Sequence, residues 1–446
     1  MNKKKYNTTP ELVVALDIGT TKVVAIAGVM NEIGQVDVLG YGKVKSEGVL
    51  RGVVANIDKT SKAIADAIDM AERKTKYEFQ VVNVGIAGQH IKSLHHRGIK
   101  LREDAQKEIA KEEVEALAKD MYKLALSPGD KILHVIPQEF SVDEEEGILD
   151  PVGMAGARLE GNFHVITGKI AAANNIMRCI QKAGIEVNEM ILEPIGSASA
   201  VLSKEEIEAG VALVDIGGGT SDITIFQDGI IRHTAVIPFG GNIITSDIKE
   251  GCTVMTEQAE KLKIKFGQAL ADDIVDNRII TIPGLKGRPP KEISEKNLAR
   301  IIQARIEEIF DQVVWEIRRS GYENKLIAGL VLTGGGALLK NIEALAEYYT
   351  GFSTRIGRPT EYLAHNRDAD LSSPIFATGI GMLRYGLLEL DIEAAREAVA
   401  RESENREKVL TDNKDGEEED SWLGTAVNRG FKLVKDFFEA TPDTDL

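Results

Sequence analysis

Residues 211–222 read VALVDIGGGTSD, an apolar strand that runs into an Asp-x-Gly turn rich in glycine. Residues 13–22 read VVALDIGTTK, so the same pattern occurs twice in the chain. A second apolar strand follows each turn, at 23–29 and at 223–226. We predict two matched β-hairpins that face each other and hold a nucleotide triphosphate with its metal ion between them.

Glycine is the residue that such turns need. Polyphosphate binding requires backbone N–H donors close to the phosphate oxygens, and consecutive turn amides form a concave anion site when no side chain blocks them. Threonine hydroxyls add further donors. The candidate phosphate ligands of the two turns are Gly19, Thr20, Thr21, Gly217, Gly218, Gly219 and Thr220.

The two aspartates require a cation. A carboxylate repels phosphate, so Asp17 and Asp215 are useful beside a triphosphate only with a metal ion between them. Mg²⁺ keeps several waters and accepts one or two carboxylates together with phosphate oxygens. The alternative is that each Asp-x-Gly is an ordinary hairpin turn, and the second copy with its matched strands argues against that interpretation. Neither a P-loop nor a dinucleotide-binding glycine fingerprint is found in the sequence.

Composition limits the class of protein. A chain of 446 residues with 43% hydrophobic residues predicts two or more globular domains. The net charge of −16 argues against nucleic acid as a partner. Cys179 and Cys252 are too few for a disulfide framework or a zinc site, so we expect both to fill core space in a reducing compartment. His95 and His96 are adjacent, and we expect surface positions for both.

Strands and helices alternate along the chain. This alternation in two similar halves predicts two α/β domains with a cleft between them, and ligand sites in such folds lie beyond the carboxyl ends of strands. A buried strand at 329–333 ends in a third glycine turn, formed by Gly334, Gly335 and Gly336. The other main predicted elements are helices at 105–125, 256–266, 294–320 and 337–349 and a loop at 143–161.

The last part of the chain has a different composition. Residues 391–420 hold twelve acidic and five basic residues, which predicts an extended linker. Residues 421–439 are apolar again and predict an amphipathic helix that lies in a membrane interface. Its apolar face contains Trp422, Leu423, Val427, Phe431, Val434 and Phe438, and its basic face contains Arg429, Lys432 and Lys435. The alternative is a helix that docks on its own domain or on a partner protein.

The three glycine turns resemble the phosphate-1, phosphate-2 and adenosine motifs of the superfamily that contains actin, heat-shock chaperones and sugar kinases. Residues 192–198 (LEPIGSA) and 376–381 (FATGIG) resemble its two connecting helices. Residues 259–263 (AEKLK) resemble the helix that touches ribose and adenine. The resemblance implies a two-domain actin-like ATPase fold.

Within this superfamily the chain is similar to the FtsA family of bacterial division proteins. Residues 81–91 and 136–154 look like the inserted subdomain 1C of that family, and a tethered C-terminal amphipathic helix is also a family trait. The implied organisation is an N-terminal tail at 1–10, subdomain 1A at 11–84 and 166–195, subdomain 1C at 85–165, domain 2 with the return to 1A at 196–390 (subdomain 2B at about 245–325), the linker at 391–420, the amphipathic helix at 421–439 and a tail at 440–446.

The resemblance also implies residue roles. ATP and Mg²⁺ would be the ligands, with Asp17 and Asp215 holding the hydrated metal ion and Lys22 joining the phosphate ligands. Glu193 and Asp222 would position water for hydrolysis, which is expected to be slow or absent. The nucleoside would be held by Glu260, Lys263, Gly334, Gly335 and Gly336.

The partners implied by the family are the C-terminal tail of FtsZ, bound on subdomain 2B, further copies of the chain in a filament, lipids of the inner membrane and other division proteins. The implied location is the cytoplasmic face of the inner membrane at the division septum.

Two alternatives use the same fold. A small-molecule kinase needs a substrate pocket and a base, and nothing in 85–165 resembles one. A chaperone ATPase needs a peptide-binding β domain after Gly386, where the remaining chain is short.

Overall fold

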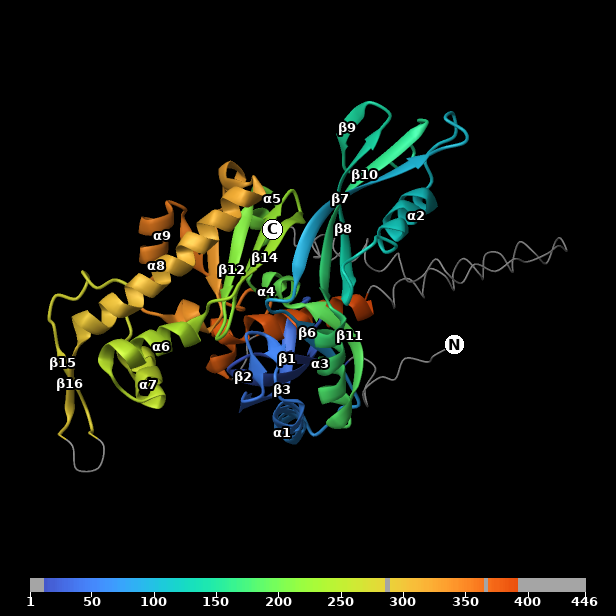
Figure 1. Ribbon diagram of the computed structural model, residues 1–446. Helices are drawn as coiled ribbons and strands as arrows, with labels where there is room; N and C mark the ends of the chain where they lie inside the picture. The colour runs from blue at the N-terminus through green and yellow to red at the C-terminus, as the bar shows by residue number, and fades with distance from the viewer. Residues whose placement is uncertain (1–11, 285–288, 365–367, 392–446) are drawn as a thin grey trace.

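The computed structural model describes residues 12–284, 289–364 and 368–391 (Figure 1). The predicted N-terminal tail at 1–10, the linker from residue 392 onward and the predicted amphipathic helix at 421–439 lie outside the described residues. Among the described helices, none combines the length and the apolar character needed to span a bilayer.

The first domain is built on a five-stranded sheet with the order β11-β6-β1-β2-β3. Strands β1, β2 and β3 form an antiparallel meander, and β6 and β11 extend it in parallel. Every residue of β1 is buried, as expected for a central strand whose two faces are both covered. The strands are β1 (Val13–Ile18), β2 (Lys22–Met30), β3 (Val36–Lys45), β6 (Val81–Ile86) and β11 (Glu186–Leu192).

The second domain repeats this arrangement in a sheet with the order β14-β13-β12-β17-β18. Its antiparallel meander is β12, β13 and β14, and β17 and β18 are the parallel strands. The strands are β12 (Val211–Ile216), β13 (Ser221–Gln227), β14 (Ile230–Ile237), β17 (Leu330–Thr333) and β18 (Thr354–Ile356). The two Asp-x-Gly turns are therefore the β1–β2 and β12–β13 hairpin turns, at equivalent places in two matched sheets. The predicted two-domain α/β fold is confirmed.

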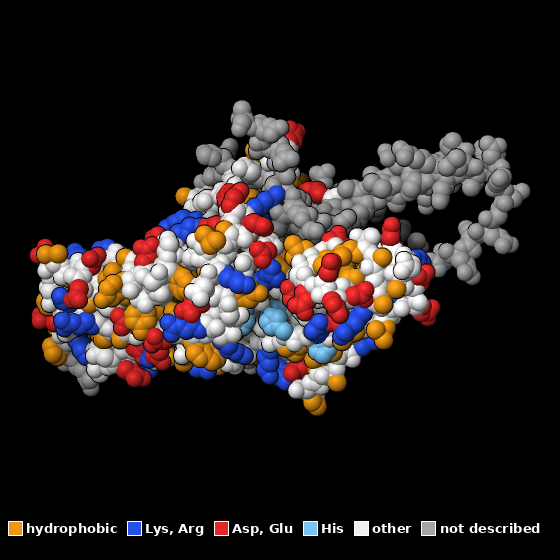
Figure 2. Space-filling model, turned by 90° about the horizontal axis from the view of Figure 1, so that it is seen from above, with side chains coloured by type: hydrophobic (Ala, Val, Ile, Leu, Met, Phe, Trp, Pro, Cys, Tyr) orange, Lys and Arg blue, Asp and Glu red, His pale blue; other side chains and the backbone are white. Residues whose placement is uncertain are grey.

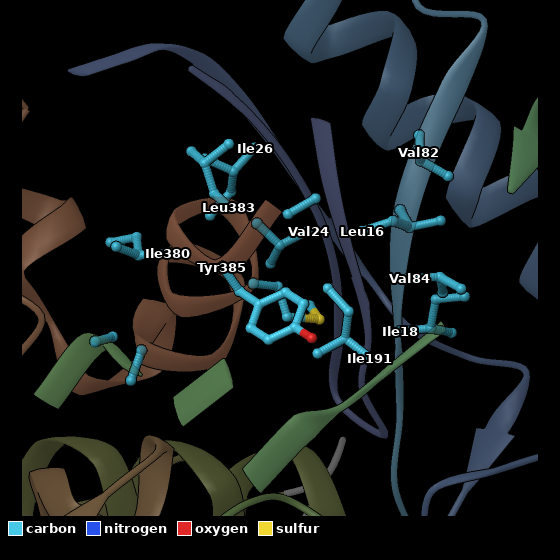
Figure 3. Close-up of a cluster of buried hydrophobic side chains, with 14 of the residues drawn as sticks. Leu16, Ile18, Val24, Ile26, Val82, Val84, Ile191, Ile380, Leu383 and Tyr385 are labelled. Carbon is cyan, nitrogen blue, oxygen red and sulfur yellow. The ribbon is translucent and has the colours of Figure 1, made fainter. Parts of the chain in front are cut away.

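Helices cover both sheets and fill the space between them. On the first sheet, α1 (Ile57–Thr75) and α3 (Ile170–Lys182) pack side by side. Between the sheets lie α4 (Glu193–Val201) and a last helix at 377–391. In Figure 3, Ile380, Leu383 and Tyr385 of this last helix lie with Val24 and Ile26 of β2. The last helix thus packs on the first domain.

The second domain carries the longest helix, α8 (Glu295–Ser320), which matches the predicted helix at 294–320. The Ser294 side chain caps it by accepting a bond from the Asn297 backbone N–H. Its apolar stripe, including Leu298, Ile302 and Phe310, is fully buried against the second sheet. The remaining elements of this domain are α5 (Lys204–Ala209), α6 (Gly241–Cys252), α7 (Thr256–Phe266), β15 (Ile279–Ile282), β16 (Lys291–Ser294) and α9 (Ile342–Thr350).

A third sheet, with the order β7-β10-β8-β9, projects from the first domain (Figure 1). Its strands are β7 (Lys92–Leu101), β8 (Asp130–Val142), β9 (Glu145–Ile148) and β10 (Arg158–Lys169), and α2 (Lys111–Met121) packs on it. It has its own core, in which Phe163 is fully buried and lies edge-on against Phe140. We call this unit the inserted sheet.

Three sequence predictions were wrong in extent. The predicted loop at 143–161 contains β9 and the start of β10, because a short, charged edge strand lacks the apolar alternation that identifies strands. The helix predicted at 105–125 is shorter in the structure, where α2 covers only residues 111–121 and buries Val114, Leu117 and Met121. The helix predicted at 337–349 begins later, because a 3₁₀ turn at Gly335–Leu338 and the left-handed Asn341 precede α9.

The inserted sheet contacts the second domain along the edge of β14. Because β7 and β14 belong to separate sheets, side chains rather than a continuous ladder join them. The Ser93 hydroxyl donates to the Thr234 carbonyl at 2.9 Å, and the Gln138 amide donates to the Ile231 carbonyl at 2.9 Å. Buried His164 lies in this contact, 3.1 Å from the Thr234 hydroxyl and 5.0 Å, ring to ring, from His95.

Histidine side chains also reach the surface beside the inserted sheet (Figure 2). His95 and His96 of β7 are exposed, as predicted. On the same face, acidic and basic side chains are interspersed. Cys179 and Cys252 are both free and buried, also as predicted.

The buried His164 predicts an acid-sensitive fold. Burial, with repulsion from His95 and His233, lowers the pKa of His164 from 6.5 to about 3. The unfolded chain therefore binds a proton below pH 6.5 that the folded chain does not, and stability falls as the pH falls from there. We expect His164→Gln to reduce this loss by up to ~1.4 kcal/mol per pH unit. Urea unfolding between neutral pH and about pH 5 measures it, with His96→Gln as the exposed control. Equal pH slopes for H164Q and the natural chain would contradict the prediction.

Candidate functional site

The two hairpin turns meet across the space between the domains. A Cβ atom on Gly218 would collide with the Thr21 methyl group, and one on Gly219 would lie 2.7 Å from the Thr20 hydroxyl. Only glycine allows the second turn to approach the first this closely. The turns therefore face each other, as their sequences predicted.

A cleft lies between the turns, with about 600 Å³ of atom-free space including its opening to solvent. Its lining contains both predicted metal ligands, both predicted water-positioning residues and all of the predicted phosphate ligands. The lining residues are Asp17, Ile18, Gly19, Thr20, Thr21, Lys22, Gly52, Ala87, Glu193, Pro194, Asp215, Gly217, Gly218, Gly219, Thr220, Asp222 and Thr378.

Negative charge dominates this lining, which has four carboxyl groups and the single ammonium group of Lys22. The Lys22 ammonium pairs with Asp17 Oδ2 at 2.8 Å. Burial lowers the pKa of Lys22, but attraction to Asp17, Asp215 and Glu193 outweighs it and the pKa is raised.

Burial has the opposite effect on the acids. It raises the pKa of Glu193 well above its ordinary value, with repulsion from Asp17 and Asp222 added. It raises the pKa of Asp222 to about 7, with repulsion from Asp215 added. The Asp222 Oδ1 atom is buried and has no hydrogen-bond partner among the described residues. A cation in the cleft would relieve all of these repulsions.

Asp215 is held by two hydroxyl groups. Its Oδ2 atom accepts from Ser197 at 2.8 Å and from Thr378 at 3.2 Å. Burial raises the pKa of Asp215, and these bonds oppose the rise. Ser197 lies in α4 and Thr378 in the last helix, the segments that resemble connecting helices. Sequence reasoning assigned neither hydroxyl a role, because a serine and a threonine in such segments carry no motif of their own.

The third glycine turn packs against Asp215 and Ile216 of the second hairpin. Gly334 has a φ of 80°, and a Cβ atom there would collide with Asp215 Oδ1. A Cβ atom on Gly336 would collide with the Ile216 side chain, whereas Gly335 is open, with its nearest neighbour 3.9 Å away. The three glycines lie outside the cleft lining, and Gly334 is directly beside the metal-ligand candidate Asp215.

Glu260 and Lys263 of α7 also lie outside the cleft lining. The Lys263 ammonium donates to the Gly241 carbonyl at 2.9 Å and pairs with Glu260 at 2.8 Å. Gly241 begins α6, and its N–H donates to the Gly217 carbonyl at 2.9 Å. The pair is therefore linked to the second turn through the start of α6.

A small hairpin that was not predicted from the sequence contributes Gly52 to the lining of the cleft. It is formed by β4 (Val49–Leu50) and β5 (Val53–Val54), and both turn residues, Arg51 and Gly52, have positive φ. The Gly52 N–H donates to the Thr20 hydroxyl at 3.1 Å. This is the pattern of a type I′ turn, for which Asn-Gly or Asp-Gly is the recognisable signal. Arg-Gly does not carry that signal.

The arrangement fits a magnesium–nucleotide complex. Bare glycine backbone at both turns can approach phosphate, and the excess of buried carboxylates with an unpartnered Asp222 oxygen calls for a cation. Within the described part of the chain, no three His, Cys, Asp or Glu side chains converge to hold a metal ion by themselves. Mg²⁺ accepts one or two carboxylates together with water and phosphate oxygens, so the predicted pair of aspartates would suit it.

The chain matches two protein-family models and is similar in sequence to known proteins. Residues 212–381 match the family model described as "Cell division protein FtsA", and residues 88–167 match "SHS2 domain inserted in FTSA". The chain is 41% identical over 377 residues to cell division protein FtsA of Pseudomonas aeruginosa, covering 84% of this chain and 89% of that protein. It is 34% identical over 386 residues to FtsA of Escherichia coli, covering 85% and 91%.

Solved structures share the fold. The PilM–PilN type IV pilus biogenesis complex aligns with a TM-score of 0.58 at 16% identity, covering 84% of this chain and 98% of that chain. MreB5 of Spiroplasma citri bound to ADP aligns with a TM-score of 0.50 at 16% identity, covering 86% and 98%. At this identity the similarity shows an actin-like fold.

The contact between the turns predicts a cost for any side chain at Gly219. In Gly219→Ala the new Cβ would lie 2.7 Å from the Thr20 hydroxyl and 2.9 Å from Arg51 Cα. We expect the free energy of unfolding of the ligand-free chain to fall by ~1–3 kcal/mol, the usual cost of overpacking. Amides 19–22 should also exchange faster with deuterium. Gly335→Ala is the control, because its Cβ would lie 3.9 Å from its nearest neighbour, Ile375, an ordinary van der Waals distance. Unchanged stability and exchange in G219A would contradict the prediction.

Proposed function

Since the chain belongs to the FtsA family of cell division proteins, we propose that it is an ATP-binding, actin-like protein that polymerises at the cytoplasmic membrane and anchors the FtsZ ring there. The cleft between two matched hairpins, with Asp17 and Asp215 in its lining, is the observation that carries the ATP-binding part of the proposal. Filament formation, FtsZ binding and the location at the septum are proposed from family membership and from the features below.

ATP with Mg²⁺ is the proposed ligand of the cleft. The bound ADP in the MreB5 structure, which has the same fold, supports a nucleotide. Asp17 and Asp215 would hold the hydrated metal ion, which supplies positive charge against the phosphates. The glycines and threonines of the two turns, with Lys22, would hold the phosphates.

The nucleoside would lie toward the third glycine turn, where Gly334, Gly335 and Gly336 leave the backbone bare. Glu260 and Lys263 would contribute from α7. Glu193 and Asp222 would position water, and we propose weak or no ATPase activity, because closing the two domains on the nucleotide requires binding and not turnover.

Removing the Asp215 carboxylate tests the nucleotide site. Asp215→Asn keeps the size of the side chain but removes the charge that the metal ion needs. We expect the affinity for Mg-ATP to fall at least ~30-fold, the typical cost of breaking a buried charge pair. Isothermal titration calorimetry measures it, with the exposed Asp66→Asn as the matched control. Mg-ATP affinity that survives in D215N would contradict the proposed metal role.

The membrane tether is proposed from the sequence of residues 421–439. Six apolar side chains, three of them aromatic, share one face of the predicted helix, and three basic side chains lie on the other. Such a helix binds an anionic membrane surface through its apolar face, with the basic residues facing the lipid headgroups. One short helix binds weakly, and many copies in a filament would bind much more strongly through avidity.

The FtsZ tail has a candidate groove between α7 and β15, in the region predicted as subdomain 2B. The groove has about 1140 Å³ of atom-free space, including its opening to solvent. Exposed apolar Phe266 and Ile279 lie in it beside the basic side chains of Lys261, Lys265 and Arg278. A peptide that carries apolar and acidic side chains would be complementary to this surface. We propose that the FtsZ tail binds here.

Reconstitution on vesicles tests both attachments in one experiment. The full chain with ATP should sediment with vesicles containing anionic lipid and should recruit FtsZ to them. A chain that ends at Asp420 should lose both activities. Lys265→Glu should lose at least ~10-fold in FtsZ recruitment while keeping membrane binding, because it reverses a charge in the groove.

Lys249→Glu, an exposed lysine of α6 outside the groove lining, is the control for that substitution. If the truncated chain still sediments with vesicles, the tether is wrong. If K265E recruits FtsZ as the full chain does, the groove is wrong and the tether is unaffected.

A further inference from the structure

Two buried hydroxyl groups reach the Asp215 carboxylate from the two segments that connect the domains. Ser197 belongs to α4 and is fully buried, and Thr378 belongs to the last helix and is 8% exposed. The Ser197 hydroxyl lies 2.8 Å and the Thr378 hydroxyl 3.2 Å from the same oxygen, Asp215 Oδ2. The two hydroxyls are 3.0 Å apart. The three groups form a closed triangle at the base of the second hairpin.

The triangle has fewer protons than contacts. Each hydroxyl carries one proton, and an ionised carboxylate carries none. Either both hydroxyls donate to Asp215, or one hydroxyl donates to the other, which then donates to Asp215. The Ser197 hydroxyl has the shorter contact with the carboxylate, 2.8 Å against 3.2 Å, so it should matter more than that of Thr378.

The same two helices touch each other next to the triangle. A Cβ atom on Gly381 would collide with the Gly196 carbonyl oxygen, so the backbones are in direct contact there. Ser197 directly follows Gly196, and Thr378 lies one helical turn before Gly381. A shift of either helix at this contact would therefore move the hydroxyls that hold the Asp215 side chain.

We propose that Ser197 and Thr378 are positioning residues, which orient the Asp215 carboxylate toward the metal ion of the bound nucleotide and tie that orientation to the contact between the two connecting helices. This inference rests on the proposed Mg-ATP site and adds two residues to it. Thr378 also lines the cleft, and the role proposed here for both hydroxyls is exerted through their bonds to Asp215.

A purely structural role would have a different signature. If the hydroxyls only satisfied a buried acid, their loss would weaken the fold and would affect nucleotide binding equally with and without metal ion. If they orient a metal ligand, their loss should reduce the contribution of Mg²⁺ to ATP affinity and leave metal-free binding unchanged. Partners that orient metal ligands typically account for roughly 10–100-fold in metal affinity.

The experiment measures ATP affinity of the full chain by calorimetry, once with Mg²⁺ and once with EDTA. We expect Ser197→Ala to lose roughly tenfold in affinity with Mg²⁺ and to change less than about twofold in EDTA. Thr378→Val, which keeps the shape of the side chain, should lose roughly threefold with Mg²⁺ only, because its contact is longer. Thr378→Ser keeps the hydroxyl and should bind Mg-ATP like the natural chain.

Thermal unfolding of each ligand-free variant shows whether it is folded, and Thr378→Val against Thr378→Ser separates the hydroxyl from the methyl group. If ATP binding by the natural chain depends on Mg²⁺ and S197A and T378V keep that dependence in full, the positioning role is wrong. It is also wrong if the two variants lose as much ATP affinity in EDTA as they lose with Mg²⁺. In both cases the nucleotide site stands. If T378S is as impaired as T378V, the hydroxyl is not the active group and the inference also fails. A natural chain that binds no ATP would overturn the proposed function and this inference together.

Discussion

Excess negative charge, buried where the two domains meet, is the constraint on which the rest of this structure depends. Asp17, Glu193, Asp215 and Asp222 line one cleft and face Lys22. Burying carboxylates without enough counter-charge is costly, so a folded chain either keeps protons on them or takes up a cation. The raised pKa values of Glu193, Asp215 and Asp222 are the first response. A metal ion with its phosphates would provide the second.

The geometry that gathers these charges depends on close backbone contact. The second hairpin turn reaches the first because Gly218 and Gly219 have no side chain, and the helices behind them touch where Gly381 meets Gly196. The inserted sheet then attaches to the second domain at β14, the neighbour of the strand that carries Asp222. A short path of bonded elements therefore joins the cleft to the inserted sheet.

Most of the architecture was predictable because it follows from repeated local patterns. Two apolar strands flanking an Asp-x-Gly turn indicate a hairpin wherever they occur, and α8 shows a regular apolar stripe with a serine cap. The strand β9 was missed because it is a short edge strand whose charged residues are exposed and show no apolar alternation. The Arg51–Gly52 turn was missed because its left-handed conformation is imposed by contacts with distant residues and not by a turn-forming sequence.

The sequence by itself determined the two hairpins, the glycines that leave their turns without side chains, and the aspartates near the end of the first strand of each hairpin. These features depend on neighbours in the chain. Only the tertiary structure decided that the turns touch each other and that Ser197 and Thr378 hold Asp215. Those contacts join residues from different domains and helices, and their partners are chosen by packing. A hydroxyl far away in sequence gains a role only when folding brings it to a buried carboxylate.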